Sequence, residues 1–296
     1  MFFTNPNQDI GGRILSWWHE LPFYSTCIII TSLILSILFY FPVFPSSFLI
    51  LNPMIIFSYY NYWSLLTFPY QHLGLLNYLF ALFSFAQTAP RNERVMGTSR
   101  YFIYFTLNNL ILGIIFIFIG LAFLEINVPA LQSIYFNSCA GLWPYIMIEI
   151  VIRCNKEPES QVQFMCFPCM IKAKYYPWFF FLLFSLLFMI MWDLLVGISI
   201  GYLHLYGVLK FTEISNGLAE KIEKFMFFCV RGLPSFIKVE RAGSEEPRLE
   251  MPDIPQQPNP RNERPVEPFS GQGYRLGGDI PPQSRQYEKF ENPDNL

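Results

Sequence analysis

The sequence has few charged residues, and one long stretch has none at all. Asp, Glu, Lys and Arg make up only 14% of the 296 residues, and none of them lies between Glu20 and Arg91. Apolar residues make up 53% of the chain, and the mean hydropathy is +0.32. A chain of this size is too apolar to be a soluble globular protein. The composition therefore predicts a membrane protein.

Other features that the sequence lacks exclude further classes of protein. The formal net charge of -2, with charges gathered near the ends and in two loops, provides no basic face for nucleic acid. No Walker A loop occurs, so the chain has no nucleotide-binding signature of its own. Residues 1–22 have no apolar core, and residues 25–44 have no small-residue cleavage site behind them. We therefore expect residues 25–44 to remain as a membrane helix, and we expect no cofactor and no nucleic-acid partner.

The apolar stretches predict six membrane-spanning helices, because a hydrocarbon core of about 30 Å needs roughly 20 apolar residues. The predicted spans are residues 25–44, 69–89, 101–124, 134–152, 175–191 and 194–211. The fifth and sixth are short, which favours local thinning of the bilayer. Only Trp192 and Asp193 separate them, in a predicted tight turn at the far interface. The predicted fold class is an all-α polytopic membrane protein.

Cationic residues alternate between the predicted loops, which indicates how the spans are oriented. They lie before the first span and after the second, fourth and sixth: Arg13, Arg91, Arg94, Arg100, Arg153, Lys156, Lys172, Lys174 and Lys210. The three remaining loops carry no cation. By the positive-inside rule, both termini and the two basic loops face the cytosol.

The region after the sixth span has two parts. Apolar residues first recur at steps of three and four, which predicts an amphipathic helix lying on the membrane. These residues are Ile214, Leu218, Ile222, Phe225 and Met226. From about residue 243, prolines recur every few residues and apolar residues are scarce, so this segment is predicted to be disordered. The expected division is a membrane domain over residues 1–240 and a cytosolic tail over residues 241–296.

A short motif stands out in this tail. Residues 269–277 have the sequence F-S-G-Q-G-Y-R-L-G. They resemble the SHP box, F-x-G-x-G-x-x-L, with which membrane adaptors recruit the valosin-containing AAA+ unfoldase. Phe269 and Leu276 are expected to fill apolar pockets, while Gly271 and Gly273 let the backbone lie against the partner. The box also contains Tyr274, Arg275 and Gly277. Ordering a flexible segment costs affinity, so we expect a weak and reversible contact.

Several stretches of the membrane domain carry a second resemblance. Residues 9–22, D-I-G-G-R-I-L-S-W-W-H-E-L-P, are similar to the amphipathic start of the Derlins, rhomboid-fold pseudoproteases of the endoplasmic reticulum. Trp63 and Thr67 match the ends of that family's W-R-x-x-T motif, but the Arg is missing. Asn77 begins N-Y-L-F, which resembles the family's second-span motif. Gln163 with residue 164, together with residues 172–178, K-A-K-Y-Y-P-W, resembles its loop into the fifth span.

The predicted sixth span extends this resemblance. Gly197 and Gly201 match the family's G-x-x-x-G, although Tyr202 stands where the family has a His, and His204 follows two places later. The resemblance covers about residues 10–211 and the tail motif. It implies a rhomboid-like fold without protease activity, in which Trp63, Thr67, Asn77, Gly197 and Gly201 serve the substrate path or helix packing.

The resemblance also implies a role. Derlins help to extract misfolded proteins from the endoplasmic reticulum for proteasomal degradation, and they act with membrane ubiquitin ligases and the unfoldase. The expected location is therefore the endoplasmic reticulum membrane, and the expected partners include these proteins, misfolded substrates and the lipid bilayer. A homo-oligomer or hetero-oligomer fits this role equally well.

Two other functions were weighed against this one. An active rhomboid protease needs a nucleophilic Ser in G-x-S-G and a His in the sixth span as its base. Here the corresponding stretch, residues 137–141, is N-S-C-A-G, so Ser138 and His204 are the available pair but the flanking glycines are missing. Helix packing is the favoured role of these residues. A small-solute transporter would be expected to show inverted repeats and interrupted helices, which the sequence does not contain.

Cysteines and intramembrane charges give weaker signals. Cys154, Cys166 and Cys169 supply three thiolates, whereas a structural zinc site has four ligands, so we expect no metal. Acylation or interfacial packing are the alternatives for these cysteines. Glu149 is predicted to pair with Arg153 four residues later. Asp193 is predicted to lie at the luminal interface. Disulfides are not expected, because Cys139 is the only Cys predicted to lie near the lumen.

Overall fold

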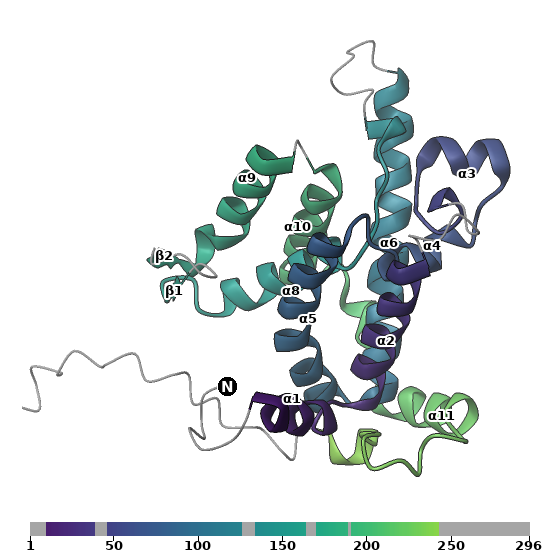
Figure 1. Ribbon diagram of the computed structural model, residues 1–296, viewed down its shortest axis with the longest axis vertical. Coiled ribbons are helices and arrows are strands. Elements are labelled where there is room, and N and C mark those ends of the chain that lie inside the picture. Colours follow the sequence, from purple (N-terminus) through teal and green to yellow (C-terminus); the bar gives the residue numbers. More distant parts are fainter. Residues whose placement is uncertain (1–9, 39–45, 126–133, 164–169, 189–190, 243–296) are drawn as a thin grey trace, which may run out of the picture. The chain divides into compact units, whose positions relative to one another are not determined.

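A computed structural model describes residues 10–38, 46–125, 134–163, 170–188 and 191–242. The chain divides into two compact units, Met1–Pro247 and Arg248–Leu296, and all described residues belong to the first. They are mostly helical, which confirms the predicted helical class (Figure 1). Among them, only α6, Thr98–Glu125, is long and apolar enough to cross a membrane by length and composition. α2, Phe23–Leu38, and α10, Trp192–Leu205, are apolar but shorter.

The described residues form further helices, 3-10 turns and a pair of strands. The other helices are α1 Ile10–His19, α3 Pro53–Tyr59, α4 Ser64–Thr67, α5 Leu75–Met96, α8 Trp143–Lys156, α9 Tyr176–Phe188 and α11 Asn216–Met226. The described residues also contain five 3-10 turns, four between helices and the last after α11: η1 Ser46–Phe48, η2 Phe68–Tyr70, η3 Ala173–Tyr175, η4 Lys210–Thr212 and η5 Val239–Arg241. Two strands, β1 Gln161–Gln163 and β2 Met170–Lys172, form an antiparallel pair.

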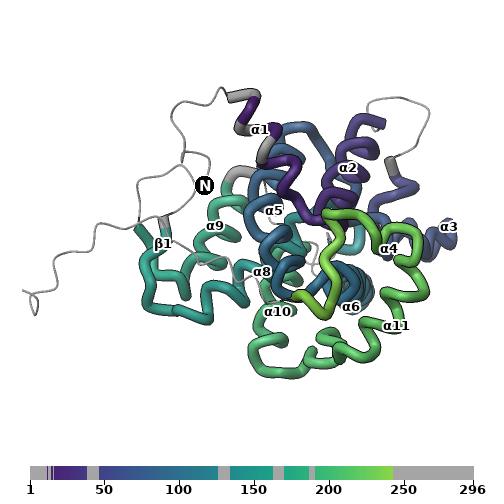
Figure 2. The backbone as a smooth tube through the Cα atoms, turned by 90° about the horizontal axis from the view of Figure 1, so that it is seen from below, coloured from purple at the N-terminus to yellow at the C-terminus, as the bar shows by residue number. Residues whose placement is uncertain are grey.

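Helix α6 organises the core. It contacts α2, α5, α8, α10 and α11, and the view from below shows it end-on among them (Figure 2). Its Phe105 ring lies 4.6 Å from that of Tyr145 on α8 and 5.9 Å from that of Tyr24 on α2, centroid to centroid. Such aromatic pairs stabilise by about 0.5–1.5 kcal/mol beyond their burial. The predicted third span, residues 101–124, is therefore confirmed as a helix, and it lies at the centre of the bundle.

The predicted fourth span is wrong in its first half. Residues 134–136 are helical, but the chain then leaves the helix, and α8 begins only at Trp143. Cys139 forms an isolated antiparallel bridge with Leu51, with N to O distances of 2.7 and 3.1 Å. Gly141 has a φ of +86°, which L side chains rarely adopt. Pro144 in the first turn of α8 then favours a new helix start.

Helix α5 begins at Leu75, later than the predicted start at residue 69, because a 3-10 turn and a short loop precede it. It also extends beyond the predicted end to Met96, and Glu93 explains why this last turn is ordered. The buried Glu93 carboxylate accepts hydrogen bonds from the backbone N–H groups of Tyr24 and Ser25, at 2.9 and 2.7 Å. It also accepts from the hydroxyls of Ser25 and Thr98, both at 2.7 Å. The first N–H groups of a helix have no hydrogen-bond partner within it. The Glu93 carboxylate accepts from two such groups at the start of α2 and, through Thr98, links this helix to α6.

Helix α10 begins and ends earlier than predicted. Trp192 and Asp193 belong to its first turn, so the predicted two-residue turn is wrong. Asp193 is buried, and its Oδ1 accepts from the Leu194 N–H at 3.0 Å; a carboxylate is favoured at a helix N-terminus. At the other end, Gly207 has a φ of +76°, and the Val208 N–H donates to the Leu203 carbonyl at 3.0 Å. This glycine-ended cap stops the helix before residue 211.

Helix α11 is confirmed within the predicted amphipathic stretch, but its apolar residues do not face the bundle. Ala219 and Glu223 are buried, whereas Leu218 is 49% and Phe225 87% exposed. The Glu223 carboxylate accepts from Arg231 Nε at 2.7 Å. α11 is therefore held by a polar anchor, and its position on a membrane surface stays a prediction.

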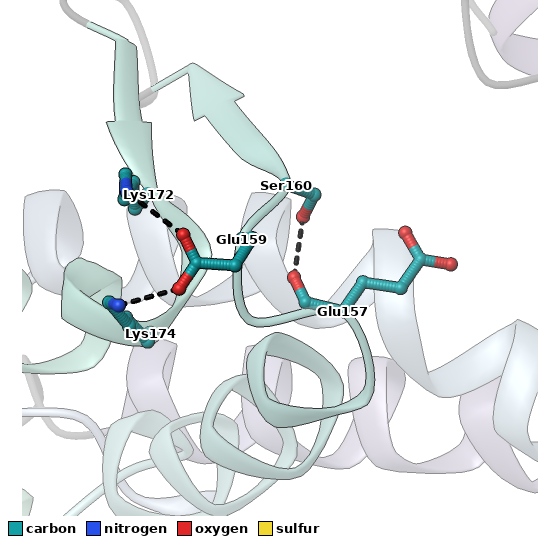
Figure 3. A network of polar contacts seen from close by, with 5 residues as sticks. All are labelled: Glu157, Glu159, Ser160, Lys172 and Lys174. Atoms are coloured by element: carbon teal, nitrogen blue, oxygen red, sulfur yellow. Dashed lines mark hydrogen bonds and ion pairs between the residues drawn. The ribbon is translucent and has the colours of Figure 1, made fainter.

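The loop between α8 and α9 is less basic than the sequence suggested (Figure 3). Glu159 lies between two of its cations and accepts from Lys172 Nζ at 2.8 Å and from Lys174 Nζ at 2.6 Å. These two ammonium groups lower the pKa of Glu159 to about 2. Because the pairs are exposed, they contribute little to stability and are screened by salt.

Candidate functional site

The two glycines of the G-x-x-x-G motif lie against α8. A Cβ atom at Gly201 would be 2.6 Å from Val151 Cβ and 3.2 Å from the Ile148 carbonyl oxygen. A Cβ atom at Gly197 would overlap the Pro144 carbonyl oxygen. The two helices therefore run side by side in the same direction, in direct backbone contact. Small residues permit such close approach of helices.

Asn77 and Trp143 join three helices near the start of α8. The buried Trp143 indole donates from Nε1 to Asn77 Oδ1 on α5 at 2.5 Å. Its ring lies 5.1 Å from Phe180 and 5.0 Å from Phe184, both on α9. Asn77 was a predicted site residue, whereas Trp143 was missed. The only sequence signal for Trp143 was a large aromatic residue directly before Pro144.

His72 supports the same region and was also missed by the sequence analysis. It is buried, and its Nε2 accepts from the backbone N–H of Leu142 at 3.2 Å, directly ahead of α8. A Cβ atom at Gly141 would lie 2.7 Å from His72 Cδ2, so the imidazole occupies the space beside that glycine. As the only His in the charge-free stretch, it could have been noticed from the sequence.

Trp63 and Thr67 fix the segment that follows α2. Trp63 Nε1 donates to the Phe48 carbonyl at 2.9 Å, and the two rings lie 4.6 Å apart. The Thr67 hydroxyl is 3.2 Å from the Leu49 carbonyl. Ser64, at the position of the family's Arg, is fully buried and donates to the Asn61 carbonyl at 2.7 Å. A buried position of this kind would leave an Arg side chain desolvated.

Ser138 and His204 lie far apart along the α8–α10 pair. Ser138 Oγ accepts from Asn52 Nδ2 at 3.2 Å, just ahead of the start of α8. His204 follows the contact of Gly201 with the other end of α8, and its Nε2 lies 2.5 Å from Asn108 Oδ1 on α6. A Ser-His pair needs direct hydrogen-bond contact. Ser138 and His204 therefore do not form a Ser-His pair in this structure.

Glu149 does not make the predicted ion pair. Its carboxylate accepts from the Tyr145 hydroxyl at 2.8 Å and from Asn92 Nδ2 at 2.5 Å. The ion pairs of the described residues do not include Arg153 with Glu149, and Arg153 is exposed, so the predicted contact is wrong. Tyr145 and Glu149 lie one turn apart on the face of α8 that packs against α5 and α6, and this face places the carboxylate beside Asn92.

An apolar hollow lies between α1 and α5. It has a volume of about 260 Å³. Its lining is Trp17, Leu79, Leu82, Phe83, Ala86 and Gln87. On the outside of α5, the apolar side chains of Leu76, Leu79 and Phe83 are 63%, 50% and 52% exposed. α9 likewise exposes Leu182 at 64% and Leu186 at 79%. Both helices thus present apolar side chains outward.

The structure leaves the tail motif untested. Phe269, Leu276 and the rest of the box lie outside the described residues, as do residue 164, Cys166 and Cys169. Within the described ranges, no group of three or more His, Cys, Asp or Glu residues could hold a metal ion. No protein-family model matches the chain, and no curated protein matches it.

Proposed function

We propose that this protein is a non-catalytic, rhomboid-like component of the endoplasmic reticulum membrane. It helps to extract misfolded proteins for degradation, and its tail recruits the AAA+ unfoldase. The observation that carries the proposal is the glycine contact of α10 with α8 in a bundle where Ser138 and His204 stay apart. This helix packing agrees with the resemblance to rhomboid-fold pseudoproteases. The separation of Ser138 and His204 leaves the serine without a histidine base.

The distribution of cations supports a membrane placement with six spans. Arg94 Nη2 donates to the Glu20 carbonyl at 2.7 Å, and Arg100 Nη1 donates to Asn216 Oδ1 at 3.0 Å. The ends of α1 and α5 and the starts of α6 and α11 therefore meet at one end of the bundle. Since these are cationic segments, the positive-inside rule assigns this end to the cytosol.

The proposed route for substrates lies between α5 and α9. Both helices expose apolar side chains, which suit contact with lipid or with an apolar segment of a substrate. Trp143 forms the inner wall of this route because it contacts both helices. The short helices α9 and α10, of 13 and 14 residues, favour a locally thinned bilayer.

The last described residues support a role for the tail. Val239 and Ala242 lie at the corner between α5 and α6, where a Cβ atom at Gly97 would be 3.2 Å from Val239 Cα and 3.4 Å from Ala242 Cβ. The Thr98 N–H donates to the Ile237 carbonyl at 2.9 Å. The tail thus follows directly on a segment that is bound to the bundle. We propose that the unfoldase supplies the energy for extraction, acting on substrates near this corner.

The decisive experiment changes the tail motif in the full-length protein. Phe269 and Leu276 are replaced together by Ala, and Phe290→Ala serves as the matched control, since it removes a tail aromatic outside the box. The double variant is expected to lose co-purification of the unfoldase from detergent extracts, while ligase and substrate still co-purify and substrate accumulates at the membrane. If the wild-type protein, the double variant and Phe290→Ala recover equal amounts of the unfoldase, the proposal is wrong.

A second experiment addresses the protease alternative. Ser138→Ala and His204→Ala are expected to leave substrate clearance intact and to remove no cleavage product. Thermal unfolding of each variant in detergent separates a loss of fold from a loss of chemistry. Clearance and a defined cleavage product that disappear together in two folded variants would establish a catalytic role instead.

A further inference from the structure

A second cavity, of about 200 Å³, lies at the end of the bundle where the cationic segments meet. It is bounded by the last turn of α5, the first turns of α6 and the segment around η4. Its lining is Val95, Met96, Arg100, Tyr104, Thr212, Glu213 and Ile214. Because Glu213 is exposed, the cavity opens to the surface. It is smaller than the about 300–1,000 Å³ of sites for drug-sized ligands, so it suits a small group.

The two charged residues of this cavity are not paired with one another. Of the five N–H donors of Arg100, one reaches Asn216 Oδ1 at 3.0 Å, and no other described residue accepts from the guanidinium. The described part of the chain likewise gives Glu213 no ion pair. One cation and one anion therefore line the same small cavity, and both are available to a ligand.

The remaining lining restricts the chemistry of that ligand. Val95, Met96 and Ile214 are apolar, so they suit methylene groups better than a fully hydrated ion. Arg100 lies at the third position of the 28-residue helix α6, whose N-terminus favours a negative group. Its guanidinium matches the geometry of a phosphate. The carboxylate of Glu213 disfavours a ligand with net negative charge.

We propose that this cavity binds the headgroup of a zwitterionic phospholipid, phosphatidylethanolamine. The phosphate contacts Arg100, the ammonium contacts Glu213, and the ethylene group between them lies against the apolar lining. A primary ammonium is preferred to a choline because it has three N–H donors for a carboxylate. Anionic headgroups bind in basic pockets at the cytosolic ends of membrane helices, whereas the one cation and one anion of this cavity suit a zwitterionic headgroup. This inference rests on the membrane placement proposed above and is independent of the role in degradation.

The test is a titration of the delipidated, detergent-purified full-length protein with short-chain lipids, followed by native mass spectrometry. The probes are phosphatidylethanolamine, phosphatidylcholine and phosphatidylglycerol, the last of which keeps the phosphate but has no ammonium. Soluble phosphoethanolamine and inorganic phosphate are added as competitors. They distinguish a headgroup site from a free-phosphate site.

Two variants remove one charge each. Arg100→Ala is expected to weaken binding of phosphatidylethanolamine about tenfold or more, since hydrogen bonds to charged groups contribute strongly. Glu213→Gln is expected to weaken phosphatidylethanolamine several-fold and to leave phosphatidylglycerol unchanged or tighter. Glu213 is exposed and its side chain forms no ion pair with another described residue, so its variant is expected to keep the fold. Lys221→Ala and Glu220→Gln on α11 are the matched controls, because they remove charges outside the cavity lining.

The proposal requires the wild-type protein to prefer phosphatidylethanolamine over phosphatidylglycerol and Glu213→Gln to abolish that preference. It also requires phosphoethanolamine to compete better than inorganic phosphate. The proposal is overturned if Arg100→Ala and Lys221→Ala weaken lipid binding equally. It is also overturned if inorganic phosphate competes as well as phosphoethanolamine. Loss of unfoldase binding in the tail variant has no bearing on this result, so the two proposals fail separately.

Discussion

Two helices pack against α8 in different ways. α10 meets it through Gly197 and Gly201, with no side chain between the backbones, so any added atom collides with Pro144 or Val151. α9 meets it through the rings of Phe180 and Phe184 on Trp143. Backbone contact leaves no room for an added side chain at Gly197 or Gly201, because interiors are close-packed, whereas the α9 contact is made by tilted aromatic rings.

The difference assigns distinct roles to the two sides of α8. The α10 side is held by close backbone contact, and α9 makes fewer contacts with α8 than α10 does. The substrate route proposed above lies on the α9 side. The predictions below separate the two sides, beginning with the contact expected to matter most.

Substitution of either glycine by Val is expected to have the largest effect. A branched side chain at Gly201 would force α10 away from Val151, and overpacking of this kind costs about 1–3 kcal/mol or more. The midpoint of thermal unfolding in detergent should therefore fall sharply. Leu186→Ala on α9, where the side chain is 79% exposed, is the control and should change nothing. If both glycine variants unfold at the same midpoint as Leu186→Ala and the wild-type protein, the position of α10 does not depend on this contact.

Asn77→Ala is expected to have the next largest effect. It leaves the buried Trp143 N–H without an acceptor, which costs about 1–3 kcal/mol. Unlike the glycine variants, it should loosen α5 from α8 and α9, so amide exchange should rise at the starts of α5 and α8. Asn137→Ala is the control, since Asn137 is exposed. Unchanged exchange in Asn77→Ala would show that this bond does not hold the edge.

Trp178→Phe should have a smaller and more local effect. Trp178 Nε1 donates to the Tyr202 hydroxyl at 3.1 Å, and this bond ties α9 to α10. A hydrogen bond of this kind contributes about 0.5–1.5 kcal/mol. Amide exchange in α9 should rise while that of α10 stays constant. A double-mutant cycle with Tyr202→Phe measures the coupling, and strictly additive single effects would contradict the bond.

The smallest expected effect is the pH response of the β1–β2 pair. The pKa of Glu159 in the folded state is about 2, below its ordinary value of 4.5. Its stabilisation is therefore fully present above pH 4.5 and is lost as the pH falls through 2. Amide exchange in residues 161–163 and 170–172 should report the loss. Glu157→Gln should leave this response unchanged, and Glu159→Gln should abolish it; a response that survives Glu159→Gln would assign it to another group.

Some of the functional site could be predicted from sequence. The spacing of Gly197 and Gly201 places both on one helix face, and that face does contact α8. Asn77 was singled out by resemblance, but its partner Trp143 was not, since no local pattern indicates which donor lies across the bundle. His72 was missed for the same reason.

The sequence alone determined the helical class of this protein. Long apolar stretches, an amphipathic run at residues 214–226 and a glycine pair are local signals, because helix periodicity and the scarcity of charge act over a few turns. Tertiary structure decided where those helices begin and end. The break before Trp143 depends on the bridge between Leu51 and Cys139, and the ordered end of α5 depends on backbone groups at the start of α2. Partners that are far apart in the chain leave no periodic trace in it, so only the folded chain shows which groups meet.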